Sequence, residues 1–286
     1  MKLLKWIISS ILTLVFIVGG CILFINAKYG INVLSVAKSL GKLAEMPDIS
    51  TVAPHAPVDA DNEATMNAVN ASIPGLVVYN SETHQYSLNT SISSTMDSDI
   101  KLTGAQTCVL LNWVLSSQET MPANIGGQEV NLKDYEFTVH QIDYAEGEEG
   151  AINFNVVMSI SLTKIKDKMT GLVLGWLKGK VPDRLYVSST VAVKKGESAF
   201  AYTVENVSLA LNNMSGKEVE QAIKLLDIVV KSGSLTDFNK NLGKSFVDAL
   251  IGNEDTPGLT YSLKSAGVND FAFEKVGDVM YYVMKK

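Results

Sequence analysis

Residues 151–193 read AINFNVVMSISLTKIKDKMTGLVLGWLKGKVPDRLYVSSTVAV, and this stretch decides the fold. From Ile152 to Leu162 every second residue is apolar, and the residues between them are mostly Asn and Ser. Such alternation predicts a strand with one apolar and one mostly polar face. A second alternating run, from Leu185 to Val193, predicts a partner strand. Because each apolar face must be buried against another layer, the stretch predicts long antiparallel strands packed on apolar helices.

The segment between the two runs, Lys164 to Pro182, predicts a helix with glycines four residues apart at 171, 175 and 179. Glycines at that spacing share one helix face and permit close backbone approach. One interpretation is a crossover helix packed on the sheet. The other is a helix that touches a membrane surface or rims a lipid cavity through Trp176 and the flanking lysines. The run is too short to span a bilayer, which takes about 20 apolar residues.

The composition favours a folded domain with a hydrophobic core and argues against a nucleic-acid-binding protein. The 286 residues are 47% hydrophobic, which is enough for a substantial core, and the formal net charge is −6. Nucleic-acid binders carry clustered positive charge, so the composition argues against a nucleic-acid partner. Residues 164–184 depart from this balance, because six basic residues stand against two acidic ones, giving +4.

The first 26 residues predict a membrane segment. Residues 6–25 are almost continuously apolar and follow Lys2 and Lys5, which suits one transmembrane helix. We expect an uncleaved signal-anchor in the cell membrane with the body extracytoplasmic. The chain then divides into a transmembrane anchor (1–27), a juxtamembrane helix and linker (28–64) and an extracytoplasmic α+β domain (65–286).

Two other interpretations of the N-terminal segment stay open. The tetrapeptide from Val18 to Cys21 loosely resembles a bacterial lipobox, which would make Cys21 an acylated terminus after cleavage. A cleaved secretory signal is the other, although the apolar run is long for one. The second cysteine, Cys108, lies in a predicted buried helix, so no internal disulfide is expected.

Weaker patterns predict the remaining elements. A hairpin is expected around Asn80, and strands with a phase slip are expected near His140 and near Asn206. Capping boxes at Thr103 with Gln106 and at Ser215 with Glu218 predict helix starts. Helical stripes cover 219–230 and 238–250, while 261–263, 271–273 and 279–283 alternate as strands, with Gly277 at the last turn.

No catalytic signature stands out. The three histidines, at 55, 84 and 140, have no second histidine or cysteine at ligand spacing, so we expect no metal and no cofactor. No nucleophile-elbow, zincin, P-loop or dinucleotide-binding pattern occurs. His140 could serve a distant serine as a base, but a histidine at a surface or a bulge is the stronger interpretation. We therefore expect a protein that is not an enzyme.

The order of elements resembles one envelope-protein family. Lys101 to Thr103 with Gln106 and the 110–115 run resemble its opening helix. The strand 152–162, the helix to Trp176 and the strand beginning at Pro182 resemble its middle, and 211–213 before Glu218 resembles a later turn. The family comprises bacterial single-pass or lipid-anchored proteins with a tubular lipid-binding (TULIP-like, YpmS-type) domain. The resemblance implies lipid binding without catalysis.

The sequence thus predicts a membrane-anchored extracytoplasmic protein that binds a lipid or another hydrophobic ligand. The alternative is a structural or partner-binding module of the cell envelope with an envelope protein as its partner. Long apolar strands on apolar helices can enclose an elongated groove. The predicted ligand-binding residues are Phe154, Val156, Met158, Ile160, Leu172, Val173, Trp176 and Leu177.

Overall fold

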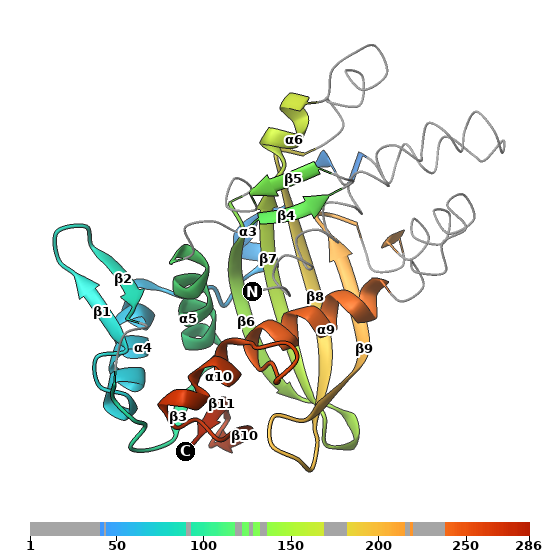
Figure 1. Cartoon of the computed structure of the whole chain (residues 1–286). Coiled ribbons are helices and arrows are strands. Elements are labelled where there is room, and N and C mark those ends of the chain that lie inside the picture. The colour runs from blue at the N-terminus through green and yellow to red at the C-terminus, as the bar shows by residue number, and fades with distance from the viewer. Residues whose placement is uncertain are drawn as a thin grey trace.

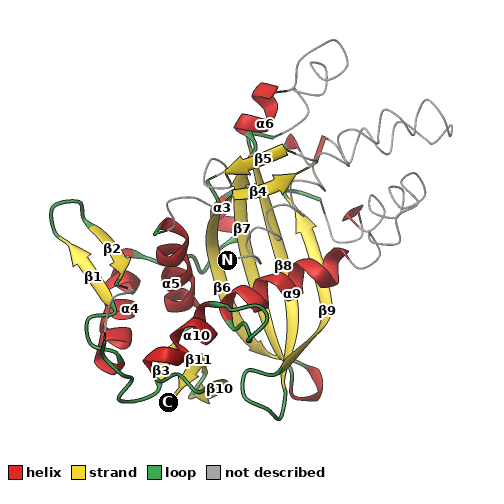
Figure 2. Ribbon diagram, in the orientation of Figure 1, coloured by secondary structure: helices red, strands yellow, loops and turns green. Residues whose placement is uncertain are grey.

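The computed structural model describes residues 41–42, 44–89, 93–117, 122–125, 128–131, 136–168, 182–214, 218–219 and 238–286. Helices and antiparallel strands are mixed in these residues, as Figures 1 and 2 show, so the predicted α+β class is confirmed at that level. The strands of the main sheet lie in the order β6-β7-β8-β9. They are β6 (Thr138–Glu146), β7 (Ile152–Ser161), β8 (Arg184–Lys195) and β9 (Tyr202–Leu211).

Both predicted phase slips are register shifts in this sheet. Between β6 and β7 the shift falls between Val139 and Gln141, which leaves His140 as the extra residue. Between β8 and β9 it falls where Thr190 pairs with Ser208 and Ala192 pairs with Glu205. A bulge increases the local twist of a strand, and Figure 1 shows these long strands twisting along their length.

The main sheet has one apolar face, as the alternation predicts. Its side chains come from all four strands and are buried within the core. They include Val139, Ile142, Phe154, Val156, Met158, Ile160, Leu185, Val187, Val191, Leu209 and Leu211. The opposite face is mostly polar and includes Asn155, Ser159, Ser188 and Thr190, with Val157 among them.

Helix α9 (Phe238–Leu250) lies across the apolar face (Figure 1) and confirms the second predicted helical stripe. Phe246, Val247 and Leu250 are buried there. Burying one such side chain contributes about 1.5–3 kcal/mol, so this contact is a main source of stability.

Helix α5 (Gly104–Ser116) packs against β6. The predicted capping box is confirmed, because Thr103 accepts from the Gln106 amide and Gln106 accepts from the Thr103 amide. Cys108 on this helix is buried, as expected.

A smaller antiparallel sheet has the order β10-β11-β3, from β10 (Asp270–Val276), β11 (Val279–Lys285) and β3 (Ile100–Leu102). The predicted turn at Gly277 joins β10 to β11, and this glycine has φ +61°. Tyr282 of β11 is fully buried and its hydroxyl lies 2.7 Å from that of Thr260.

The other elements complete the described chain. The predicted hairpin is β1 (Val77–Asn80) with β2 (Gln85–Leu88), and β4 (Pro122–Ile125) pairs with β5 (Gln128–Asn131). The helices are α3 (Ile49–Val52), α4 (Asp59–Ser72), α6 (Thr163–Lys168) and α10 (Leu259–Ser262), with 3₁₀ turns η2 (Glu148–Gly150) and η3 (Leu263–Ala266). Helix α4 thus occupies part of the segment that the sequence suggests as linker.

One predicted strand is wrong. Residues 261–263 lie in α10 and η3 instead of a strand. The Thr260 hydroxyl donates to the Leu250 carbonyl at 2.8 Å, and the Tyr261 amide donates to the Ile251 carbonyl at 3.0 Å. These bonds fold the chain back onto the end of α9, and two alternating residues carry no information about such a tertiary anchor.

Several predictions fall outside the described residues. They are the anchor at 6–25, the juxtamembrane helix as far as residue 40, most of the helices at 164–182 and 219–230, and the Ser215 cap. Within the described part of the chain, no helix has the length and apolar character that a bilayer crossing requires.

Candidate functional site: two faces of the long sheet

The four predicted ligand-binding residues on β7 share one face of the main sheet. Phe154, Val156, Met158 and Ile160 are each 0–1% exposed and belong to the core. Because these side chains are almost completely buried, water does not contact them in this structure. The four predicted residues on the helix, Leu172, Val173, Trp176 and Leu177, lie outside the described residues.

The end of this face near Phe154 is filled by aromatic rings. The Phe154 ring lies 5.0 Å from Tyr144, 5.3 Å from Phe273 and 6.5 Å from Phe246, measured between ring centroids. Such edge and tilted contacts add about 0.5–1.5 kcal/mol per pair beyond burial. This end of the apolar face is therefore ordinary core.

The other end of the face is lined by aliphatic and thioether side chains. Met158 pairs with Val187 and Ile160 pairs with Leu185 across the β7–β8 ladder, and Val187 pairs with Leu211 on β9. Met and branched aliphatic side chains make non-directional contacts and adapt to an apolar guest more readily than stacked rings. The side chains that line this end are apolar and carry no acid–base group.

A buried polar group lies beside the apolar face, where α9 meets β9. Asp248 is 3% exposed, and the Tyr202 hydroxyl donates to its carboxylate. Lys244 donates to both carboxylate oxygens, at 2.7 and 2.6 Å. Burial, followed by the adjacent Asp248 carboxylate, raises the pKa of Tyr202 well above its usual value. The carboxylate is thus neutralised, as a buried charge must be.

The polar face carries a second cluster, formed by His140, Ser159 and Arg184. The Nε2 atom of His140 lies 2.7 Å from the hydroxyl of Ser159 on β7, and Arg184 of β8 donates to the same hydroxyl at 3.0 Å. The sequence singles out His140 but misses Ser159. The available signal is that both side chains fall on the polar face of strands that pair with each other.

Glu136 holds Arg184 in place. Its carboxylate lies 2.5 Å from one guanidinium nitrogen, and its backbone carbonyl accepts from the other at 3.3 Å. Glu136 has φ +46°, a left-handed conformation that is uncommon outside glycine. Burial and the neighbouring Arg184 charge lower the pKa of His140, which favours the neutral imidazole.

A serine bonded to a neutral histidine has the geometry of a nucleophile and its base. Ser159, however, has no exposed surface. A substrate carbonyl cannot reach the hydroxyl in this arrangement, and Arg184 already occupies one of its acceptor positions. We interpret the cluster as a structural polar network that fills the bulged end of the sheet.

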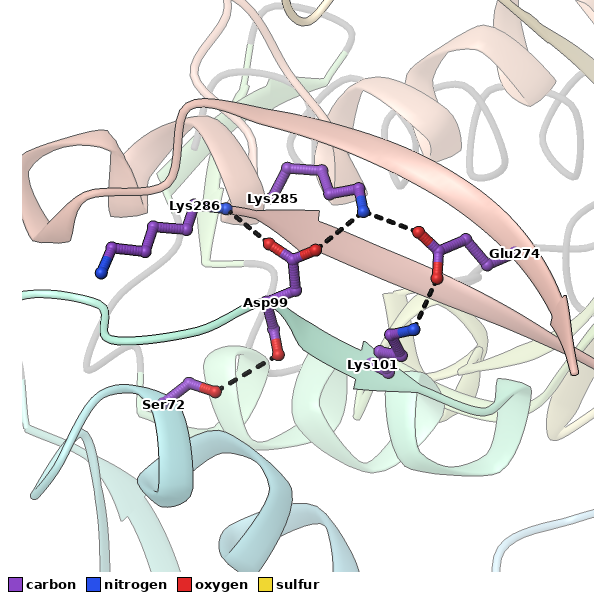
Figure 3. Close-up of polar contacts among 6 residues, drawn as sticks. All are labelled: Ser72, Asp99, Lys101, Glu274, Lys285 and Lys286. Carbon is purple, nitrogen blue, oxygen red and sulfur yellow. Dashed lines mark hydrogen bonds and ion pairs between the residues drawn. The ribbon is translucent and has the colours of Figure 1, made fainter.

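An ion-pair network joins the strands of the smaller sheet, as Figure 3 shows. The Lys285 ammonium lies 2.7 Å from Asp99 and 2.6 Å from Glu274, and Lys101 lies 2.6 Å from the other oxygen of Glu274. The backbone amide of Lys286 donates to Asp99 at 2.9 Å. Hydrogen bonding to Lys285 lowers the pKa of Asp99, and hydrogen bonding to Lys101 lowers that of Glu274.

Three ion pairs therefore link Lys101, Glu274, Lys285 and Asp99 in series, so the two positive and two negative charges balance within the network. Within the described residues, no group of three or more His, Cys, Asp and Glu side chains is placed to hold a metal ion. Comparison with protein-family models, with curated proteins and with solved structures gave no match.

Proposed function

We propose that the chain is a membrane-anchored extracytoplasmic binding protein for a lipid or another hydrophobic ligand, and that it is not an enzyme. The anchor would be the apolar run at residues 6–25, and the ligand would lie against the β7–β8–β9 part of the apolar face around Met158, Ile160 and Val187. The resemblance to tubular lipid-binding domains supports the same proposal. Leu172, Val173, Trp176 and Leu177 remain predicted ligand contacts.

One observation carries this proposal. The apolar face of the main sheet continues along β7 past the ring-filled end to residues whose side chains are flexible or aliphatic. Met158 and its aliphatic neighbours can rearrange around a guest more readily than stacked rings can. Because these side chains are buried without a ligand, binding requires that they exchange contacts with the protein for contacts with the ligand.

A fluorescent fatty acid titrated into the domain without residues 1–40 tests the proposal. The Met158→Gln variant keeps the side-chain length but adds an amide that an apolar ligand cannot satisfy. We expect binding to weaken about tenfold, which corresponds to about 1.4 kcal/mol. The matched control is Ser188→Ala, on the opposite face of β8. If both variants are folded by circular dichroism and bind the fatty acid with equal affinity, the proposed binding site around Met158 is contradicted.

A second candidate function has its own support. The complete burial of Phe154, Val156, Met158 and Ile160 without a ligand is what a solid core produces. The domain would then be a structural or partner-binding module of the envelope. Crosslinking in intact membranes separates the two, because this candidate requires a stable protein partner and predicts no bound lipid.

A further inference from the structure

The segment that follows the predicted anchor is fastened to one end of the main sheet. The Lys42 ammonium lies 2.5 Å from the Glu218 carboxylate, and the Asn213 side chain donates to the Glu45 carbonyl at 3.2 Å. Asn213 comes two residues after the end of β9. Residues 42–45 are therefore held where β9 finishes.

The same segment is fastened again at β6. The Gln141 side chain accepts from the His55 backbone amide at 2.9 Å, and the His55 ring lies 3.0 Å from the Asp143 carboxylate. Ala53 is 3% exposed. Because β6 and β9 are the two edge strands of the main sheet, residues 42–55 span its width, and we call them the strap.

The strap determines which end of the domain lies nearest the anchor. Its first attachment is at the end of the sheet where Ile160 pairs with Leu185 and where α6 follows β7. Only residues 26–41 separate this attachment from the apolar run, and sixteen residues reach at most about 50 Å. Without the strap, the first fixed element would be α4, which begins at Asp59 and lies far from α6 in Figure 1.

The two ends of the sheet differ in charge and in exposed apolar groups. At the strap end, Met46 and Ile49 are 50% and 37% exposed, and the 164–184 segment, with its net charge of +4, begins there after β7. At the other end, the β6–β7 turn carries Glu148 and Glu149, which are both exposed. Anionic headgroups attract basic segments and repel carboxylates, so a bilayer suits the strap end.

We propose that the strap orients the Ile160 end of the main sheet toward the bilayer, and that the ligand is a lipid taken from the membrane that holds the anchor. The identity of this ligand rests on the proposed function. Met158, Ile160 and Val187 lie at the end of the apolar face nearest the strap's first attachment, and the ring-filled end lies away from the membrane. A lipid then reaches the apolar face without exposing its chain to water.

Fluorescence quenching tests the orientation. The full chain carrying Cys21→Ser is reconstituted in phosphatidylcholine and phosphatidylglycerol vesicles that contain a lipid with a spin-labelled headgroup. A fluorophore is attached at Thr163→Cys or at Glu148→Cys, two exposed positions that flank the ten residues, or about 33 Å, of β7. We expect the label at residue 163 to lose most of its fluorescence and the label at residue 148 to lose little.

A released variant tests the role of the strap. It combines Lys42→Ala, His55→Ala, Gln141→Ala and Asn213→Ala, which remove the side-chain contacts described above. We expect the difference in quenching between residues 163 and 148 to be lost, with the fold checked by circular dichroism. If this variant does not fold, Lys42→Ala with Asn213→Ala must still reduce the difference. The control is His84→Ala, an exposed histidine between β1 and β2, which should keep it.

Equal quenching at residues 163 and 148 in the unmodified chain would overturn the proposal, and so would a difference that the released variant keeps in full. The fatty-acid titration of the domain without residues 1–40 does not depend on orientation. Failure of that titration together with unequal quenching would contradict the proposed ligand alone. Fatty-acid binding together with equal quenching would contradict the orientation alone.

Discussion

The side chain of Asn112 takes the place of a neighbouring strand for Val139. It donates to the Val139 carbonyl at 2.7 Å and accepts from the Val139 amide at 3.0 Å. Strand β6 is at the edge of the main sheet, so on this side the Val139 amide would otherwise lack a partner, and the Val139 carbonyl would keep only the weak thiol donor of Cys108, 3.2 Å away. This explains the polar Asn112 within the apolar run Cys108–Leu115 of α5.

We expect Asn112→Leu to lower the free energy of unfolding by about 1–3 kcal/mol, because it removes the partner of the Val139 amide and leaves the Val139 carbonyl with only the Cys108 thiol as donor. Urea denaturation of the domain measures the change. Ser117→Ala, an exposed residue at the end of the same helix, is the control and should change stability by less than about 0.5 kcal/mol. A fully stable Asn112→Leu variant would show that Val139 finds other partners.

Cys108 should be unreactive in the folded protein. Burial raises the pKa of its thiol to about 12, and its sulfur lies 3.2 Å from the Val139 carbonyl. Since the thiolate is the reactive form, we expect almost no alkylation by iodoacetamide at pH 8 in buffer and complete alkylation in urea. Peptide mapping distinguishes Cys108 from Cys21. Rapid modification of Cys108 in the native state would contradict its burial.

The ion-pair network of Figure 3 should make stability sensitive to acid. The folded-state pKa values of Asp99 and Glu274 are lowered, so their contribution is present above about pH 4.5 and disappears as the pH falls through those values. Both carboxylates are about one-third exposed, at 32% and 31%, so solvent screening limits each pair to about 1 kcal/mol or less.

The double variant Asp99→Asn with Glu274→Gln tests this network through thermal unfolding measured between pH 2.5 and pH 7. We expect a lower melting temperature than the unmodified chain near neutral pH and a smaller difference between them at the acid end. Parallel curves across the whole range would mean that the pairs do not contribute.

The pKa of His140 should lie below the usual histidine value of about 6.5, because burial and Arg184 both disfavour the imidazolium. The unfolded chain takes up a proton first, so this group lowers stability as the pH falls below about 6.5. NMR titration of the ring protons measures the pKa. Removing the charge with Arg184→Gln should raise it, and an unchanged value would rule out the Arg184 contribution.

The hydroxyl of Ser159 should not react as a serine nucleophile. It is buried beneath His140 and Arg184, so we expect no labelling by a fluorophosphonate probe under native conditions. Labelling that disappears in both Ser159→Ala and His140→Gln would contradict the structural interpretation of this cluster.

Period-two alternation was the most informative signal in this sequence. Strand β7 extends from 152 to 161 and β8 from 184 to 195, close to the predicted runs, because each strand buries one continuous face. The bulge at His140 was also predictable, since a bulge reverses which side of the pattern faces the core.

The sequence does not indicate which residues far apart in the chain contact each other. Nothing in the local pattern around Thr260 indicates that its hydroxyl bonds to Leu250 and Tyr282, which hold helix α10 against these two residues. Ser159 looks like any serine on a polar strand face until its neighbour across the ladder is known. Asn112 likewise gains its role from a strand 27 residues away in the chain.

The central claim is that the domain holds an apolar ligand between the sheet and its covering segments. Organic extraction of the domain without residues 1–40, purified without detergent, followed by mass spectrometry of the extract, tests it most directly. The account predicts a lipid or other apolar molecule at a near-stoichiometric ratio in the unmodified domain and much less in Met158→Gln. Folded domain that carries no apolar molecule, and takes none up when lipid is supplied, would contradict it.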